Sequence, residues 1–370
     1  MRMPILPLFA ASLGADTTQV GIINAAFMLS AGLLAIPFGL LSDRIGQRAL
    51  LFGGLLIIAG SSLLIPLSSG PLMMGSVYLL SGAGMAAFTP TMMSFVANIT
   101  PVSHLGRAYS LYTTAVYLGM TIGPAAGGLL GRTFGLGKVF WFSGGTVFMA
   151  LPFMLVFLSK EDTHPFPKGE HRSVWQTITT LLKNRRLTAC LVGTLGGCFG
   201  FGMFVTFLPL YANTGGLNAG HVGVIFAAQA LSNVILRIPF GRLSDRVNRS
   251  VMAACGLIIF AVALATIGLF NDLASFIIIA AVVGIGMGIS FTVIGALVSE
   301  VVSREERGIS LGMYNSCIYL GMMLSSATMG GVIHRVGFGW SFAFAGGCTL
   351  LATALFFAGL QHAAKVSLPE

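Results

Sequence analysis

Eleven apolar runs, each of 18 or more residues, follow one another along this chain of 370 residues. A helix of about 20 apolar residues crosses the roughly 30 Å hydrocarbon layer of a bilayer, so each run predicts a membrane-spanning helix. The runs begin near Thr18, Gln47, Leu72, Gly106, Lys138, Leu187, Gly220, Val251, Ala274, Gly308 and Phe338. The apolar residues are continuous and do not alternate with polar ones, which excludes the pattern of a β-barrel. The sequence therefore predicts an all-α membrane protein.

Charged residues are few and unevenly placed. They make up 8% of the chain, whereas a soluble domain carries about 25%. The net charge of +9 would suit a nucleic acid, but 15 of the 20 Lys and Arg residues fall on one side of the predicted membrane. The positive-inside rule makes that side cytoplasmic. We expect a multi-pass inner-membrane protein with its connector and C-terminus in the cytoplasm, in contact with a lipid bilayer and with no nucleic-acid partner.

The residue types that carry enzyme chemistry are not arranged for it. The five cysteines lie inside apolar runs without metal-ligand spacing, so they are interpreted as small apolar side chains. No Ser-His-Asp set, HExxH motif or intramembrane carboxylate pair is present. Neither a metal, a cofactor nor an enzymatic activity is expected.

The second half of the chain repeats the first at an offset of 202 residues. Residues 6–50 and 208–252 are identical at 21 of 45 positions without a gap. Each half holds six apolar segments, an even number, so equivalent points of both halves lie on the same membrane face. The predicted fold is two six-helix bundles related as parallel repeats.

This repeat predicts three parts. They are a transmembrane bundle over residues 1–158, a cytoplasmic connector over 159–186 with a surface helix near 174–182, and a second bundle over 187–370. The first helix is incomplete, because its apolar residues would span only about 18 Å. By comparison with the repeat, we expect about 16 residues upstream to complete it.

A loop motif after the second helix indicates a family. The stretch Gly39-Leu-Leu-Ser-Asp43-Arg44-Ile-Gly46-Gln-Arg48 resembles the signature loop of the major facilitator superfamily. A second copy, Gly241-Arg-Leu-Ser-Asp245-Arg246, keeps five of the ten residues of this stretch. Asn248 and Ser250 stand where the first copy has Gly46 and Arg48. The resemblance covers essentially the whole chain and implies the major facilitator fold.

The resemblance also implies a latch. In this superfamily the loop aspartate is understood to engage the start of a helix in the other half and to hold the cytoplasmic side shut. Carried over, Asp43 would meet the helix that starts at Arg307, and Asp245 the one that starts near Gly106. A helix N-terminus carries about half a positive charge, which stabilises a carboxylate. The alternative is that these charges only set the topology.

A second motif lies in the predicted fifth helix. Gly119-Met-Thr-Ile-Gly123-Pro124-Ala-Ala-Gly127-Gly128 resembles the GxxxGPxxGG signature associated with drug:proton antiporters. Three of its glycines share one helix face, where another helix can pack closely, and the proline permits a bend. The resemblance implies export coupled to protons. An ordinary close-packed helix pair is the alternative.

Ionisable residues inside the predicted helices are scarce. None of the eleven complete runs holds an Asp or Glu near its middle, and Tyr78 stands where family members often carry an arginine. Arg237 is well inside a helix and shares a face with Gln229 and Asn233. This stripe predicts the wall of a wet cavity, and the alternative is an arginine that reaches the membrane surface.

The other candidates for a substrate cavity come from repeat symmetry and from the helices that line the cavity in this superfamily. They are Asn24, Phe27, Met28, Thr113, Tyr117, Phe291, Thr292, Asn315 and Tyr319. Their sparse polarity predicts a lipophilic or weakly polar small molecule. For each of them, packing in the protein core is the alternative.

The predicted function is export of a small organic compound, drug-like or a metabolite, by proton antiport through alternating access in a monomer. Uptake or facilitated diffusion of a sugar or other small metabolite is the first alternative. A non-transporting membrane sensor is a remote one.

Overall fold

The computed structural model describes residues 1–101, 104–157, 174–244, 247–303 and 306–366. Their regular elements are helices. The first half contains α1 (Arg2–Ser12), α2 (Thr17–Ile45), α3 (Gln47–Leu64), α4 (Pro71–Asn98), α5 (Leu105–Phe134) and α6 (Leu136–Phe157). The second half contains the short α7 (Val174–Leu181), then α8 (Arg185–Thr214), α9 (Ala219–Ser244), α10 (Arg249–Thr266), α11 (Leu273–Glu300) and α12 (Arg307–Val366).

The helices begin where the sequence predicts the apolar runs to begin. Ten starts lie within two residues of their predicted positions, and the eleventh run starts at a break inside α12. There Gly337 has φ +79° and ψ 173°, so α12 is two helices joined at a kink. Nine described helices are long and apolar enough to cross a membrane, and one of these spans, of 53 residues, covers both arms of α12. α1 has 11 residues and is too short to cross.

The sharp turns recur with the repeat. Gly14 and Gly216, which follow α1 and α8, have φ angles of +84° and +81°. Gly135 and Gly337, which follow α5 and its counterpart in α12, have φ angles of +92° and +79°. Only glycine adopts this left-handed region without steric cost, so these four positions let each half turn back at equivalent points.

Helix packing inside the halves is also equivalent. In the first half, Ser30 Oγ of α2 donates to the Leu79 carbonyl oxygen of α4 at 2.7 Å. In the second half, Ser232 Oγ of α9 donates to the Ala281 carbonyl oxygen of α11 at 2.9 Å. The residues of these two bonds are 202 positions apart. The predicted fold, two six-helix bundles as parallel repeats, is confirmed.

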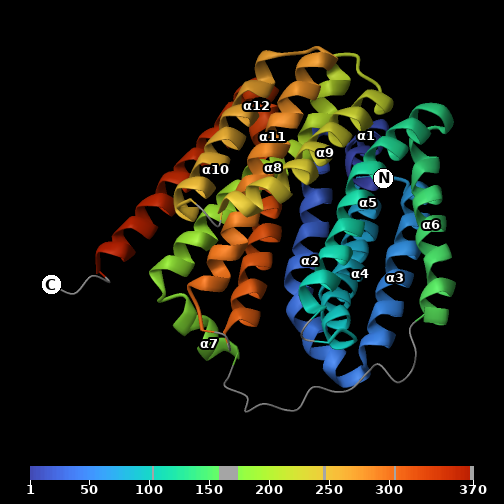
Figure 1. Ribbon diagram of the computed structural model, residues 1–370. Coiled ribbons are helices and arrows are strands. Elements are labelled where there is room, and N and C mark those ends of the chain that lie inside the picture. The colour runs from blue at the N-terminus through green and yellow to red at the C-terminus, as the bar shows by residue number, and fades with distance from the viewer. Residues whose placement is uncertain (102–103, 158–173, 245–246, 304–305, 367–370) are drawn as a thin grey trace.

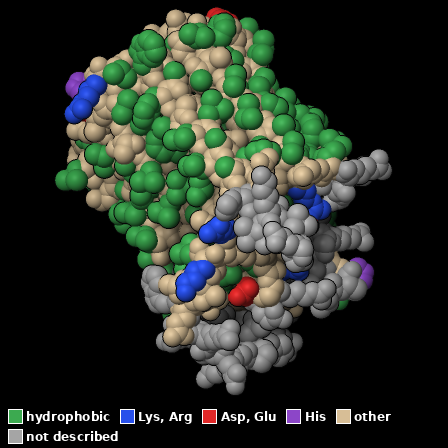
Figure 2. All heavy atoms as spheres, turned by 90° about the vertical axis from the view of Figure 1, so that its left-hand side faces the viewer, with side chains coloured by type: hydrophobic (Ala, Val, Ile, Leu, Met, Phe, Trp, Pro, Cys, Tyr) green, Lys and Arg blue, Asp and Glu red, His purple; other side chains and the backbone are tan. Residues whose placement is uncertain are grey.

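Figure 1 shows the two bundles side by side, leaning together near α1 and α9 and separating towards α7. We call the end where the bundles separate the α7 side, and the end where they lean together the opposite side. α1 contacts α5 of its own bundle and α8 and α9 of the other, so it lies where the bundles meet. Figure 2 shows one outer face, on which hydrophobic side chains are spread over the upper part and several Lys and Arg side chains lie in the lower part. Large apolar side chains such as Phe153 and Trp340 are 66% and 76% exposed, as expected for a protein whose solvent is lipid.

Candidate functional site

Two helix crossings join the bundles on the opposite side, and glycines form both. In the first crossing, a Cβ on Gly128 of α5 would lie 2.6 Å from the Ala219 carbonyl oxygen of α9 and 2.8 Å from Gly223 Cα. A Cβ on Gly223 would lie 2.7 Å from the Pro124 carbonyl oxygen. Real Cβ atoms essentially never come within 3.0 Å of such atoms. The two backbones therefore touch at a distance that glycine alone allows.

The second crossing, between α2 and α12, is the repeat equivalent of the first. Gly21 lies against the Ser326 carbonyl oxygen, and Gly330 lies against the carbonyl oxygen of Thr17. Thr17 Oγ1 also donates to the Gly330 carbonyl oxygen at 3.1 Å. Thr17 begins α2, and Gly330 precedes the kink of α12, so this crossing also lies on the opposite side. The bundles are in contact there through two symmetry-related crossings.

Two of the remaining glycines of the α5 motif lie against Met1, at the start of α1. A Cβ on Gly123 would lie 2.8 Å from Met1 N, and a Cβ on Gly127 would lie 2.6 Å from Met1 O. A Cβ on Gly119 would have no atom of another helix within 4 Å. The motif therefore holds α5 between α1 and α9, with close packing at three of its glycines and open space at the fourth.

The first loop motif forms a tight turn that is tied to its own bundle. Gly46, with φ +89°, separates α2 from α3. Gln47 Nε2 donates to Ser94 Oγ of α4 at 2.8 Å, and Arg48 Nη2 donates to the Leu155 carbonyl oxygen of α6 at 3.4 Å. These bonds fix the start of α3 against two neighbouring helices.

The predicted latch contacts lie largely outside the described residues. The structure does not describe five of the side chains concerned, those of Asp43, Arg44, Arg107, Asp245 and Arg246. Gly39 lies in α2 and Gly241 in α9. The structure begins α12 at Arg307, where the latch prediction places a helix start.

The second loop copy departs from the first in sequence and in geometry. Asn248 caps α10, because its Oδ1 accepts from the backbone N–H groups of Ser250 and Val251 at 3.0 and 3.4 Å. Gly46 instead ends a helix with a positive φ. The replacement of glycine by asparagine therefore exchanges one turn chemistry for another.

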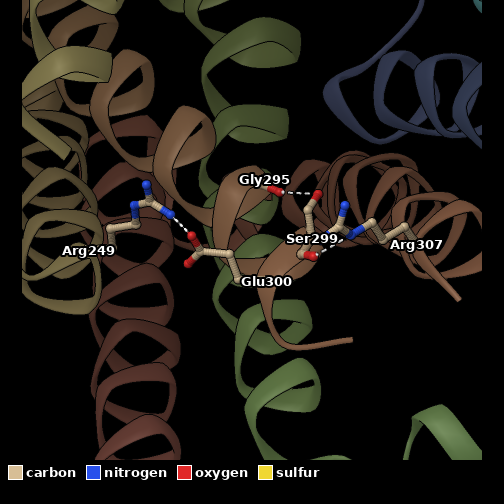
Figure 3. A network of polar contacts seen from close by, with 5 residues as sticks. All are labelled: Arg249, Gly295, Ser299, Glu300 and Arg307. Atoms are coloured by element: carbon tan, nitrogen blue, oxygen red, sulfur yellow. Dashed lines mark hydrogen bonds and ion pairs between the residues drawn. The ribbon is translucent and has the colours of Figure 1, made fainter. Parts of the chain in front are cut away.

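A polar network lies beside this turn on the α7 side (Figure 3). Arg249 of α10 forms an ion pair with Glu300 at the end of α11. Arg307 Nε donates to the Ser299 carbonyl oxygen at 2.9 Å, which ties the start of α12 to α11. Ser299 Oγ donates to the Gly295 carbonyl oxygen at 3.2 Å. The network joins three helices of the second bundle.

The α2 candidates face the interior of the first bundle. The Phe27 ring stacks on Tyr78 of α4, with ring centroids 4.8 Å apart. Asn24 is 4% exposed, and its Nδ2 has no hydrogen-bond partner in the described structure. Met28 is buried in the same core. On α5 two further candidates, Thr113 and Tyr117, are half-buried.

Two residues of the α9 stripe lie against α11 of their own bundle. Gln229 is buried, and its Nε2 lies 3.9 Å from Met287 Sδ. The Asn233 carbonyl oxygen lies 3.0 Å from the position of a Cβ on Gly288. The Arg237 side chain lies outside the described residues.

The α11 and α12 candidates have different surroundings. The Phe291 ring packs against Gly197 of α8, and Thr292 Oγ1 is buried without a hydrogen-bond partner in the described part of the chain. Asn315 is exposed and donates from Nδ2 to the Leu311 carbonyl oxygen at 3.0 Å. Tyr319 contacts the other bundle, because its Cβ lies 3.1 Å from the position of a Cβ on Gly32 of α2.

Arg2 was not among the predicted site residues, and it reaches into the first bundle. Its Nη1 donates to Ser62 Oγ of α3 at 2.9 Å and to Ser81 Oγ of α4 at 2.8 Å. Arg237 was predicted to be an arginine inside a helix, and Arg2 was not. One sequence signal could have found it: its repeat equivalent is Phe204, so a position that is charged in one half is apolar in the other.

Parallel six-helix bundles that meet at paired crossings, with polar side chains held between apolar helices, are the architecture of transporters built from parallel repeats. Comparison with known proteins identifies the family. The model described as Major Facilitator Superfamily matches residues 1–223 and 214–370, and the chain belongs to this family. It is a multi-pass membrane transporter and not an enzyme.

Relatives of this chain come from several kingdoms. It is 25% identical to the Multi-drug resistance efflux pump PmrA homolog of Lactococcus lactis over 351 residues, which cover 90% of this chain and 85% of that protein. It is 30% identical to Multidrug resistance protein MdtG of Proteus mirabilis over 272 residues, 70% of this chain and 66% of that protein. It is 26% identical to the human MFS-type transporter SLC18B1 over 379 residues, 96% of this chain and 81% of that protein.

A solved structure shares the fold. It is a bacterial homolog of the human lysosomal transporter Spinster, in an inward-facing and unoccupied conformation. The TM-score is 0.80 at 15% sequence identity, and the match covers 100% of this chain and 94% of that chain. At this identity the likeness shows the fold alone.

Proposed function

We propose that this protein is a monomer that exports a small organic compound across the inner membrane in exchange for protons, with its α7 side in the cytoplasm. The observation that carries this proposal is the use of the antiporter-type motif. Gly123, Gly127 and Gly128 pack α5 against α1 and α9, at the contact between the bundles. The names of the relatives from Lactococcus lactis and Proteus mirabilis, an efflux pump and a multidrug resistance protein, support the same direction of transport.

Export by such a molecule requires no covalent chemistry. Residues 1–158 and 187–370 would each move as one body, joined by the connector over 159–186. With the bundles in contact on the opposite side, the compound would enter from the α7 side. Its binding would favour a state in which the two glycine crossings separate and the α7 side closes. A ligand can shift this equilibrium only by its differential affinity for the two states.

The loop motif would stabilise the second state. In that state Asp43 would lie at the start of α12, where the backbone N–H groups of the first turn have no helical partner. The carboxylate gains this interaction only when the α7 side is shut. It therefore acts as a conformational latch rather than as a substrate ligand.

The experiment uses the purified full chain in liposomes with a pH-sensitive dye inside. Candidate compounds, beginning with the anion benzoate and the cation ethidium, are added on the α7 side under an imposed proton gradient. Export by antiport predicts that the compound moves against its own gradient, that protons move the other way, and that nigericin abolishes both. Movement only down the compound's gradient would overturn proton coupling in favour of facilitated diffusion. No flux of any compound by correctly inserted protein would overturn export itself.

A further inference from the structure

The guanidinium group of Arg2 has hydrogen-bond partners at only one of its three nitrogen atoms within the described residues. Nη1 donates to both Ser62 Oγ and Ser81 Oγ, and these hydroxyls are the acceptors that the Arg2 side chain has within the described residues. No carboxylate pairs with it in that part of the chain. The Nε–H and Nη2–H groups remain. They form the planar two-donor edge of the guanidinium, which matches the two oxygens of a carboxylate.

The fold itself does not require polar groups at this place. The repeat equivalents of Arg2, Ser62 and Ser81 are Phe204, Leu264 and Val283. All three equivalents are 0% exposed and pack in an apolar core. The second bundle thus fills the equivalent space with apolar side chains. A cation inside a membrane bundle is unfavourable without an anion or water beside it, so its presence in one half indicates a function.

Asn24 is a second donor without a partner. Its side chain is 4% exposed, and Nδ2 makes no hydrogen bond in the described structure. The equivalents of Asn24 and Arg2 in the other bundle are Phe226 and Phe204, whose ring centroids are 5.2 Å apart. From this contact and the repeat we infer that Asn24 and Arg2 lie near each other where α1 meets α2. A buried amide donor beside a guanidinium favours an acceptor that carries negative charge.

An aromatic wall adjoins these donors. Phe27 follows Asn24 by about one turn on α2, and Tyr78 precedes Ser81 by about one turn on α4. The two rings stack with centroids 4.8 Å apart. Flat apolar surface next to charged donors suits a compound with an aromatic or alkyl body and an acidic group. Since α1 also contacts α8 and α9, a ligand held by Arg2 touches the helix that lies between the bundles.

We propose that Arg2, Ser62, Ser81 and Asn24 form a binding site for the carboxylate of the transported compound. The site accepts two carboxylate oxygens on the Nε and Nη2 edge of Arg2, with Asn24 Nδ2 as a further donor. The substrate is then an organic acid rather than a neutral or cationic drug. The transport part of this inference rests on the proposed function, whereas carboxylate binding does not.

The test measures binding to the purified full chain by calorimetry, with benzoate as the probe. Benzamide and benzyltrimethylammonium have the same ring and lack the negative charge. Saturable binding of benzoate in preference to both is expected. Arg2→Gln should weaken benzoate binding about tenfold or more, because a buried charge partner is lost. Arg335→Gln, which removes an exposed arginine near the kink of α12, is the matched control and should leave the affinity unchanged.

A second variant distinguishes loss of the binding site from misfolding. The combination Arg2→Phe, Ser62→Leu and Ser81→Val introduces the residues that the other bundle uses at the same positions. It should insert and unfold like the unmodified chain and bind no benzoate. Equal affinity for benzoate and benzamide, loss of affinity in Arg335→Gln, or benzoate binding by the triple variant would each overturn the site. Benzoate binding without flux of any compound would overturn the export proposal and leave the site in place.

Discussion

Gly128 of α5 and Gly223 of α9 lie so close that a Cβ on Gly128 would be 2.8 Å from Gly223 Cα. The two residues belong to different halves of the chain, and in the equivalent crossing between α2 and α12 Gly330 lies against Thr17, which corresponds to Ala219. Small residues at such crossings let backbones approach closely in a membrane, where dispersion contacts replace the hydrophobic effect between helices. The opposite side is therefore held by contacts that any added side chain disturbs.

Gly128→Val tests this crossing. The added side chain collides with Ala219 and Gly223, so we expect flux per inserted molecule to fall at least about tenfold and the fold to lose about 1–3 kcal/mol of stability. Flux in liposomes and thermal unfolding are the measurements. Gly119→Val in the same helix is the control, since a Cβ on Gly119 would have no atom of another helix within 4 Å. Equal effects of the two variants would show that the α5–α9 contact has no special role.

Asp43→Asn tests the latch. The change removes the negative charge and keeps the shape, so we expect membrane insertion close to that of the unmodified chain and flux per molecule reduced at least about fivefold, as a charge at a helix N-terminus is lost. Quantitative immunoblotting of membranes, combined with flux, separates the two effects. Unchanged flux would contradict the latch.

Cysteine labelling tests the exposure of the cavity candidates. In a background without the five native cysteines, a cysteine at Asn315 should react with an impermeant maleimide faster than one at Gln229, because Asn315 is exposed and Gln229 is buried against Met287. The maleimide is applied from the α7 side. Slower labelling after addition of a transported compound would place Asn315 in the substrate path. Faster labelling at Gln229 would contradict the described conformation.

Arg249 and Glu300 form a testable ion pair at the α7 side. Their side chains are 24% and 52% exposed, so water and salt screen the interaction. A double-mutant cycle with Arg249→Gln and Glu300→Gln should give a coupling energy of about 0.2–1 kcal/mol, which decreases in high salt. Thermal unfolding of the four forms measures it. A coupling energy that salt does not change would rule out an exposed ion pair.

We expect the stability of the chain to depend on pH through Asp272, which precedes α11 outside the membrane-spanning segment. Its Oδ2 accepts from the Ser275 backbone N–H at 2.8 Å and caps α11. Bonds from Ser275 hold the pKa of this carboxyl below its usual 3.8. The stability that the cap contributes is therefore complete above pH 3.8 and is lost as the pH falls through the lowered pKa.

The matching measurement compares the unmodified chain with Asp272→Asn. We expect a higher unfolding temperature for the unmodified chain at pH 6 and a smaller difference at pH 3. A difference that stays constant between these two pH values would contradict the assignment of the pKa to this cap.

The order and the limits of the helices follow from the sequence alone. About 20 apolar residues must cross the hydrocarbon whatever the neighbouring helices are, so each run predicts its helix locally. The repeat likewise predicts the equivalence of the two halves, down to turn glycines such as Gly14 and Gly216. The loop and α5 motifs place the chain in its family before any contact is known.

The direction of each side chain was decided by the tertiary structure. Lipid is as apolar as a protein core, so hydropathy does not distinguish the faces of a membrane helix. The Phe27 ring stacks on Tyr78, and Gln229 lies against Met287. The Arg2 side chain meets Ser62 and Ser81, which are about 60 and 80 residues away along the chain, only because α3 and α4 pack against each other and the start of α1 lies within reach of both. Contacts of that range depend on the rotation of several helices at once, which no local pattern encodes.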